Sequence, residues 1–268
     1  MINFKDITES TSFYNFHTHT QFCDGHAPME EFVTEAIAMG FRHLGFTPHG
    51  PISIESPCNM TRDNVNAYLS EINRLQEAYG SVITIYAGME VDYVGGVEQN
   101  DPFMMQLPLD YRIGSVHFIP SFDDPQEYVD IDGRFERFKV KMSTYFHGDI
   151  EAVIRSYFSQ YMDMLDKGGF DVAGHFDKIG LNASLYSEGI DDCEWYDQLV
   201  ERAFASIMDH GYAVEVNTKS WHNYNRFFPH LKYFDMLKKY HATILVNSDA
   251  HYPSLINSGR EEALQLLT

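Results

Sequence analysis

Short apolar runs alternate with longer stretches of helical periodicity along almost the whole chain. From Arg62 to Tyr79, for example, apolar side chains recur every three or four residues, and Gly80 follows as a helix stop. The other predicted helices cover 28–39, 150–165, 195–210, 233–240 and 260–267. Between the helices lie apolar runs that predict seven strands, at 13–19, 41–49, 82–92, 111–118, 170–177, 212–217 and 242–251.

This succession of strand-then-helix units predicts an α/β fold, a parallel barrel of the (β/α) kind that lacks the eighth unit of the standard form. No linker, low-complexity block or like-charge run divides the chain, so we expect a single domain over 1–268. The segment 120–147 is long for a simple connection. It is either a cover over an active site or a plain surface excursion.

A histidine or a carboxylate stands at the end of nearly every predicted strand. In chain order these residues are His17, His19, His49, Glu90, His117, His175, Asp249 and His251. A single histidine in such a place usually has no special role, but the carboxyl ends of barrel strands together build one active site. The joint placement therefore predicts a common site. We expect His43 at the opposite end of its strand and His147, His210, His230 and His241 at the surface.

The residue types in this predicted site indicate metal binding. Imidazole and carboxylate groups without thiolates favour zinc, iron or manganese over calcium or copper(I). One tetrahedral ion takes three or four ligands, so the number of candidates implies a cluster of two or three ions. Such clusters hold phosphoryl or carbonyl oxygens and lower the pKa of a bridging water, which makes hydrolysis the natural reaction class.

Charge and cysteine content narrow the possible partners and compartment. The chain has 268 residues, 44% of them apolar, and its 19 Lys and Arg against 39 Asp and Glu leave a net charge of −20. That charge disfavours a nucleic-acid backbone or an anionic membrane as partner. The cysteines are Cys23, Cys58 and Cys193, an odd and widely spaced set that fits a reducing compartment. With no apolar leader or membrane-length run, we expect a cytoplasmic protein and leave its oligomeric state open.

Several short motifs run in order along nearly the whole chain. They are His17-Thr18-His19-Thr20 with Phe22-Cys23-Asp24-Gly25, Thr47-Pro48-His49, Gly88-Met89-Glu90-Val91-Asp92, Gly114-Ser115-Val116-His117, Gly174-His175-Phe176-Asp177, Glu215-Val216-Asn217 and Ser248-Asp249-Ala250-His251. In this set the chain resembles the PHP superfamily, named for polymerase and histidinol phosphatase domains. The resemblance implies a distorted (β/α)7 barrel and three metal ions. Within the superfamily, the chain is similar to the stand-alone histidinol-phosphate phosphatases of histidine biosynthesis.

The resemblance also implies which residues bind the ions. Carried over by position, His17, His19, Glu90 and Asp249 bind one ion, and Glu90, His117 and His175 bind its neighbour. Asp24, His49 and His251 bind the third, with His26 as the alternative to Asp24. The implied reaction is hydrolysis of L-histidinol phosphate by in-line attack of a metal-bridging hydroxide. Glu90, Asp249 and His251 are the catalytic candidates. The leaving alkoxide is protonated by water or by a nearby acid, for which Asp249 and His251 are the candidates.

The rest of the predicted site should recognise the substrate, a small phosphate monoester. Arg155 and Lys219 are candidates to hold the phosphate, and Asn217 to contact the substrate, while the acidic, aromatic stretch 128–132 would suit an amine and an imidazole. One alternative is a phosphoesterase of the same superfamily that acts on a phosphoprotein, a sugar or nucleotide phosphate, or a DNA end. Another is a metal-binding regulatory module without catalysis.

Overall fold

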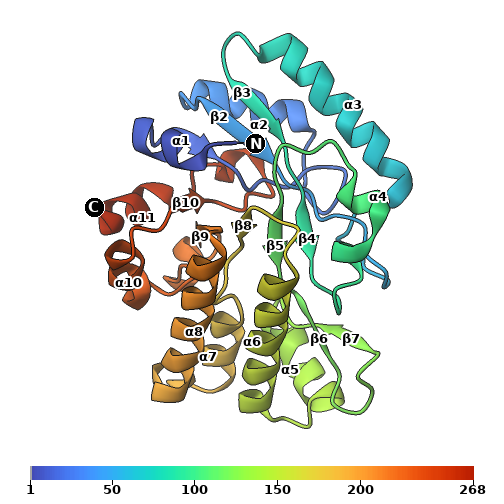
Figure 1. Cartoon of the computed structure of the whole chain (residues 1–268), viewed down its shortest axis with the longest axis vertical. Coiled ribbons are helices and arrows are strands. Elements are labelled where there is room, and N and C mark those ends of the chain that lie inside the picture. Colours follow the sequence, from blue (N-terminus) through green and yellow to red (C-terminus); the bar gives the residue numbers. More distant parts are fainter. Residues whose placement is uncertain (1) are drawn as a thin grey trace.

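The computed structural model describes residues 2–268, and parallel strands form its centre (Figure 1). One sheet has the order β1-β2-β3, with β1 at Tyr14–Asn15, β2 at His43–Phe46 and β3 at Thr84–Ala87. The other has the order β10-β9-β8-β5-β4, with β4 at Glu90–Asp92, β5 at Ile113–Ser115, β8 at Val172–Ala173, β9 at Ala213–Asn217 and β10 at Ile244–Asn247. Every pairing in these two sheets is parallel.

Isolated bridges join the two sheets into a ring. Thr18, beyond β1, forms a parallel bridge with Ala250, beyond β10, and His49, beyond β2, forms another with Glu90. The run 84–92 changes partner in its middle, since β3 pairs with β2 and β4 pairs with β5. The strands therefore follow one another in sequence order round a closed circuit. The α/β class with parallel strands is confirmed, and this circuit is the one that the expected (β/α)7 barrel requires.

Helices surround the strands (Figure 1). The six predicted helices are present as α2 (Met29–Ala38), α3 (Arg62–Tyr79), α6 (Ile150–Lys167), α8 (Glu194–His210), α10 (Phe234–Lys239) and α11 (Arg260–Leu267). Further helices are α1 (Phe4–Ser10), α4 (Pro102–Met105), α5 (Phe135–Tyr145), α7 (Ile179–Tyr186) and α9 (Trp221–Tyr224), and short 3-10 turns cover Glu98–Asn100, Ile190–Asp192, Leu231–Tyr233 and Pro253–Leu255. The sequence pattern did not indicate α7, because its residues show no single apolar face.

The long segment 120–147 has structure of its own. Strands β6 (Phe118–Pro120) and β7 (Tyr128–Asp130) form an antiparallel hairpin, and α5 follows it. Both lie at the far end of the molecule from α3 (Figure 1). Tyr128, Asp130 and Asp132 line the same cavity as the strand-end residues. The segment therefore forms part of the wall of this cavity.

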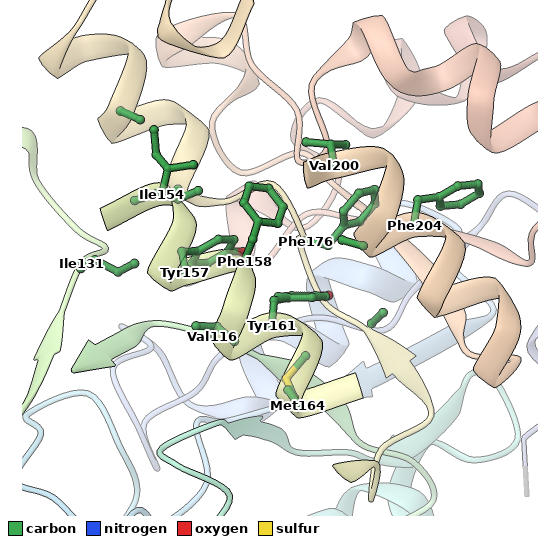
Figure 2. Close-up of a cluster of buried hydrophobic side chains, with 14 of the residues drawn as sticks. Val116, Ile131, Ile154, Tyr157, Phe158, Tyr161, Met164, Phe176, Val200 and Phe204 are labelled. Carbon is green, nitrogen blue, oxygen red and sulfur yellow. The ribbon is translucent and has the colours of Figure 1, made fainter. Parts of the chain in front are cut away.

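A large apolar cluster between the strands and helices α6 and α8 fixes one strand end. Figure 2 shows Phe176 lying between Tyr161 of α6 and Phe204 of α8, with ring centroids 6.4 and 6.3 Å away. Phe176 is fully buried and directly follows His175. Because interiors are close-packed, this anchor leaves little freedom to the strand end that carries His175.

A buried tyrosine supports the first strand in a similar way. The Tyr111 hydroxyl donates a hydrogen bond of 2.6 Å to the carbonyl of Phe16, the residue before His17. A Cβ at position 45 would lie 2.0 Å from that hydroxyl, so only glycine fits there. Gly45 and Tyr111 together hold the start of the His17–His19 stretch in place.

The observed strands are shorter than the predicted ones, mostly because the ladders stop before the polar residues at their ends, although Glu90 and Asp92 lie within β4 itself. The predicted strand 242–251 forms a ladder only over Ile244–Asn247. Two residues later Asp249 adopts a left-handed backbone with φ of 50°, which interrupts the ladder before Ala250 pairs with Thr18. Among the described residues no helix is both long enough and apolar enough to cross a bilayer.

Candidate metal centre

The predicted strand-end residues meet at the carboxyl ends of the parallel strands. They line or underlie a cavity of about 320 Å³ whose wall includes Asp24, His49, Glu90, Asp92, His117 and Asp249. The side chains of His17, His19 and His175 lie deeper and are almost fully buried. The structure thus brings together the nine residues that the sequence suggested as metal ligands, while their roles as ligands stay predictions.

Glu90 lies at the middle of this cluster and faces two groups of histidines. Its Oε2 atom is 3.2 Å from His17 Nε2 and 3.4 Å from His19 Nε2. Its Oε1 atom is 2.9 Å from His175 Nε2 and 3.7 Å from His117 Nε2. Each oxygen of Glu90 thus faces a different set of imidazole nitrogens, and with metal ions bound Glu90 would be a ligand common to both sets.

Asp249 follows the neighbouring strand β10 and faces the same pair of histidines. Its Oδ1 atom lies 3.0 Å from His19 Nε2 and 3.9 Å from His17 Nε2. The left-handed backbone at Asp249 and the positive φ at His175 are uncommon for residues other than glycine. Strained backbone of this kind tends to occur where a side chain must be aimed for function.

Asp24 and His251 form a third group, in which their partner is His19 and not the predicted His49. Asp24 lies 3.3 Å from His19 Nδ1 and 3.4 Å from His251 Nε2. His49, the predicted third member, instead approaches Glu90 Oε2 at 3.2 Å and Asp92 Oδ2 at 3.3 Å. His26, the alternative to Asp24, is exposed and stacks on Tyr252 with ring centroids 4.4 Å apart. The geometry therefore favours Asp24.

A tight turn brings Asp24 back to the cluster. The backbone N–H groups of Cys23 and Gly25 both donate to the carbonyl of Thr20, at 3.0 Å each. A Cβ at position 25 would lie 2.2 Å from the Thr20 nitrogen, so the turn requires glycine.

Asp92 is a further carboxylate of this centre. It makes a short contact with His117 Nδ1 and accepts a hydrogen bond of 2.7 Å from Asn59 Nδ2. A carboxylate on the second nitrogen of an imidazole fixes its tautomer, so Asp92 directs His117 Nε2 toward Glu90. The equal parity of Glu90 and Asp92 in their strand was the signal for this pair.

The cluster combines buried imidazole nitrogens that have no hydrogen-bond partner with several carboxylates, as a cation site requires. His17 Nε2, His19 Nε2 and His49 Nδ1 are buried and have no hydrogen-bond partner. Burial opposes a charge on His17, but Glu215, Glu90 and Asp249 outweigh it and raise its pKa to about 10. For His49, burial is likewise outweighed, mainly by Glu90 and Asp92, and its pKa rises to about 9. The cavity therefore favours positive charge, and its residues fit divalent metal ions.

Two lysines stand beside Asp249, and the sequence indicated one of them. Lys219 Nζ, on the loop after β9, is 3.2 Å from Asp249 Oδ1. Lys178 is buried, and its Nζ is 3.6 Å from Asp249 Oδ2 and 3.5 Å from Asp132 Oδ2. The sequence reading missed Lys178. Its position three residues after His175, in the same strand-end loop, was the available signal.

Two residues predicted to contact the substrate are not available for it. Arg155 is on the outer side of α6, where its guanidinium pairs with Glu151 at 2.7 Å and lies over the Trp195 ring. It therefore cannot hold a phosphate at the strand ends. Asn217 is fully buried, and its Nδ2 donates to Asp249 Oδ2 at 3.1 Å and to Glu215 Oε2 at 3.3 Å. The amide nitrogen of Asn217 is bonded to these carboxylates, and its oxygen accepts a hydrogen bond from the Lys219 backbone N–H, so neither is available to a substrate.

Comparisons with known proteins agree with this geometry. Residues 15–219, about three quarters of the chain, match the PHP domain family. The chain is 25% identical over 254 residues to a probable histidinol-phosphatase of Schizosaccharomyces pombe, covering 88% of this chain and 80% of the relative. It is 27% identical over 218 residues to a histidinol-phosphatase of Bacillus subtilis, covering 75% and 79%.

Solved structures show a similar fold. A putative histidinol phosphatase from Listeria monocytogenes superposes with a TM-score of 0.83 at 21% identity, covering 93% of this chain and 99% of that one. The histidinol phosphate phosphatase of Lactococcus lactis, in complex with zinc, L-histidinol and phosphate, superposes with a TM-score of 0.74 at 21% identity, covering 96% and 92%.

Proposed function

The chain belongs to the PHP domain family, and we propose that it is a metal-dependent phosphomonoester hydrolase that converts L-histidinol phosphate and water to L-histidinol and phosphate. The observation that carries this proposal is the placement of Glu90 between two groups of buried histidines. The curated relatives named above are histidinol-phosphatases, and the related Lactococcus lactis structure contains zinc, L-histidinol and phosphate.

Two or three divalent ions, zinc, manganese or iron, fit the donor set. His17, His19, Glu90 and Asp249 would hold one, Glu90, His117 and His175 a second, and Asp24 and His251 with His19 or His49 a third. When bound, such ions neutralise phosphoryl oxygens and lower the pKa of water enough to supply a nucleophile near neutral pH.

Lysines of this chain would orient the phosphate. Lys219 lies beside Asp249 Oδ1 and lines the cavity with it, and the buried Lys178 lies beside Asp249 Oδ2. Burial disfavours charge on Lys178, but Asp132 and Asp249 outweigh it and raise its pKa, so it stays a cation. Fixed cations beside a reacting phosphate stabilise the charge that spreads over its oxygens in the transition state.

The leaving alkoxide needs a proton once its bond to phosphorus breaks. Burial and Lys219 lower the pKa of His251 to about 3, so this imidazole is neutral at pH 7. Burial alone would raise the pKa of Asp249, but Lys219, His17 and Lys178 lower it well below its usual range. Neither group carries a proton to give, so both suit ligand roles, and solvent water is the proposed proton source.

The mouth of the cavity suits a substrate with a cationic end. Asp130 and Asp132 of the hairpin segment line it together with Tyr128 and Phe118. Carboxylates would attract the ammonium group of histidinol phosphate, and an aromatic face offers a contact for its imidazole. Folding as one domain over 1–268, a cytoplasmic location and the absence of nucleic-acid and membrane partners stay predictions from the sequence.

Steady-state phosphate release from a panel of substrates tests the proposal. The zinc- or manganese-loaded protein should hydrolyse histidinol phosphate with a kcat/KM well above that for p-nitrophenyl phosphate, sugar phosphates, nucleotides and phosphopeptides. A kcat/KM for histidinol phosphate no better than that for p-nitrophenyl phosphate would overturn the substrate assignment. No hydrolysis of any member at full metal content would favour the regulatory alternative.

A further inference from the structure

Glu215 is a fully buried carboxylate in the middle of the apolar strand β9, next to the metal centre but outside its predicted ligand set. Its two oxygens accept hydrogen bonds from four donors. Oε1 accepts from His17 Nδ1 at 2.7 Å and from Asn247 Nδ2 at 3.0 Å. Oε2 accepts from the backbone N–H of His175 at 3.0 Å and from Asn217 Nδ2 at 3.3 Å.

An ionised carboxylate satisfies all four contacts when His17 is in the tautomer that carries its proton on Nδ1. An amide in its place would set its own NH2 group against one of the pairs of donors, and buried donors left without acceptors are costly. The four contacts therefore favour an ionised Glu215 at the buried side of the centre.

Three of these four hydrogen bonds lead to a predicted ligand. The bond from His17 Nδ1–H leaves Nε2 of the same ring free, and Nε2 is the atom that faces Glu90 at 3.2 Å. The bond from the His175 backbone holds a residue whose φ is 21°. Asn217 donates to both Glu215 and Asp249, so it ties the Asp249 carboxylate to the same anchor.

We propose that Glu215 is a positioning residue of the metal centre, which sets the tautomer of His17, holds the strained turn at His175 and, through Asn217, orients Asp249. The proposal rests on the proposed function only in taking the centre to bind metal ions. Carboxylates behind metal-bound histidines orient the ring and make its other nitrogen a stronger ligand. Glu215 in addition contacts His17 and His175 directly, and Asp249 through Asn217, so it orients predicted ligands that follow three different strands.

Glu215→Gln tests this, because it keeps the size of the side chain and removes only its ability to accept at both ends. The zinc affinity of the purified variant, measured by competition with a chromophoric chelator, should fall by about 10- to 100-fold. Asp171→Asn is the matched control. Asp171 Oδ2 accepts a backbone N–H, that of Arg112, at 2.8 Å, at the start of the strand that leads to His175. The control should keep wild-type zinc affinity even where it lowers stability.

The outcomes separate this proposal from the proposed substrate. Weaker zinc binding by Glu215→Gln supports it whether or not histidinol phosphate is the substrate, and zinc affinity equal to that of wild type or of Asp171→Asn overturns it. If Glu215→Gln does not fold, NMR of histidine-labelled, zinc-loaded wild type decides. His17 should then carry a proton on Nδ1 and zinc on Nε2, and the opposite tautomer overturns the proposal.

Discussion

Lys178 joins the hairpin segment to the metal centre, because its Nζ lies 3.5 Å from Asp132 Oδ2 and 3.6 Å from Asp249 Oδ2. Asp132 belongs to the hairpin segment that lines the cavity, and Asp249 is a predicted metal ligand. A buried cation between the two is placed to meet a phosphate that enters from the hairpin side. This relationship links the wall of the cavity to its proposed chemistry.

Replacing Lys178 by methionine should impair turnover more than folding. Methionine keeps most of the apolar stem, while the charge beside the phosphate is lost. Hydrogen bonds to charged groups contribute about 1.5–3 kcal/mol, so kcat/KM for histidinol phosphate should fall roughly 10- to 100-fold. Initial rates of phosphate release on metal-replete protein measure this.

Arg155→Ala is the control for that measurement, since Arg155 is exposed and pairs with Glu151 away from the cavity. Its kcat/KM should equal that of wild type. A Lys178→Met variant with wild-type kcat/KM would limit Lys178 to a structural ion pair.

Asp24→Asn and His26→Ala together decide which residue completes the third group of ligands. Asp24 lies within 3.4 Å of His251 and His19, whereas the ring of His26 stacks on Tyr252. Elemental analysis after dialysis should therefore show less metal per chain in Asp24→Asn and an unchanged content in His26→Ala. The reverse pattern would return the role to His26.

Removing the metal should make stability depend on pH in a definite direction. In the metal-free protein the surrounding carboxylates outweigh burial and raise the pKa of His17 to about 10 and that of His49 to about 9. Both exceed the value of 6.5 for a free histidine, so protonation stabilises the fold fully below pH 6.5. This contribution is lost as the pH rises through the two folded-state pKa values.

Thermal unfolding in the presence of a chelator should therefore give a Tm that falls as the pH rises from 6.5 toward 10. Saturating zinc should raise the Tm and reduce this fall, because ions replace the protons and binding to the native state stabilises it. Activity should disappear with the chelator and return with zinc or manganese. A metal-free Tm that rises over this pH range would contradict the charge balance of the cluster.

The sequence predicted the parts of the fold that periodicity controls and the residues at which the strands end. The helix Arg62–Tyr79 has the predicted bounds because one apolar stripe and a following glycine define it. The helix α7 was missed because it is nearly apolar all round. The strand 82–92 was predicted as one piece, since the change of pairing partner between β3 and β4 is a tertiary event without a local signal.

For the site, strand-end placement found the ligands but not the residues that act on them from other strands. Glu215 was visible as a carboxylate within an apolar run, yet its link to His17 joins positions 198 residues apart. Arg155 was proposed from its charge alone, and helix α6 presents it to solvent. Residue type and spacing thus predicted which side chains meet at the strand ends. Which other residues orient those side chains depends on packing, which the sequence pattern does not show.

Phe176→Ala should lower both the stability of the protein and its zinc affinity. Phe176 is fully buried between α6 and α8 and directly follows His175 (Figure 2). Truncating a buried phenylalanine to alanine costs about 3–5 kcal/mol, so urea unfolding of the chelated protein should show a loss of that size. The space left by the missing ring also frees the backbone at His175, and the zinc affinity should fall with it.

Phe158→Ala is the control, because Phe158 belongs to the same cluster without adjoining a predicted ligand. It should lose stability but keep its zinc affinity, and equal zinc affinities in the two variants would show that the anchor at Phe176 does not position His175.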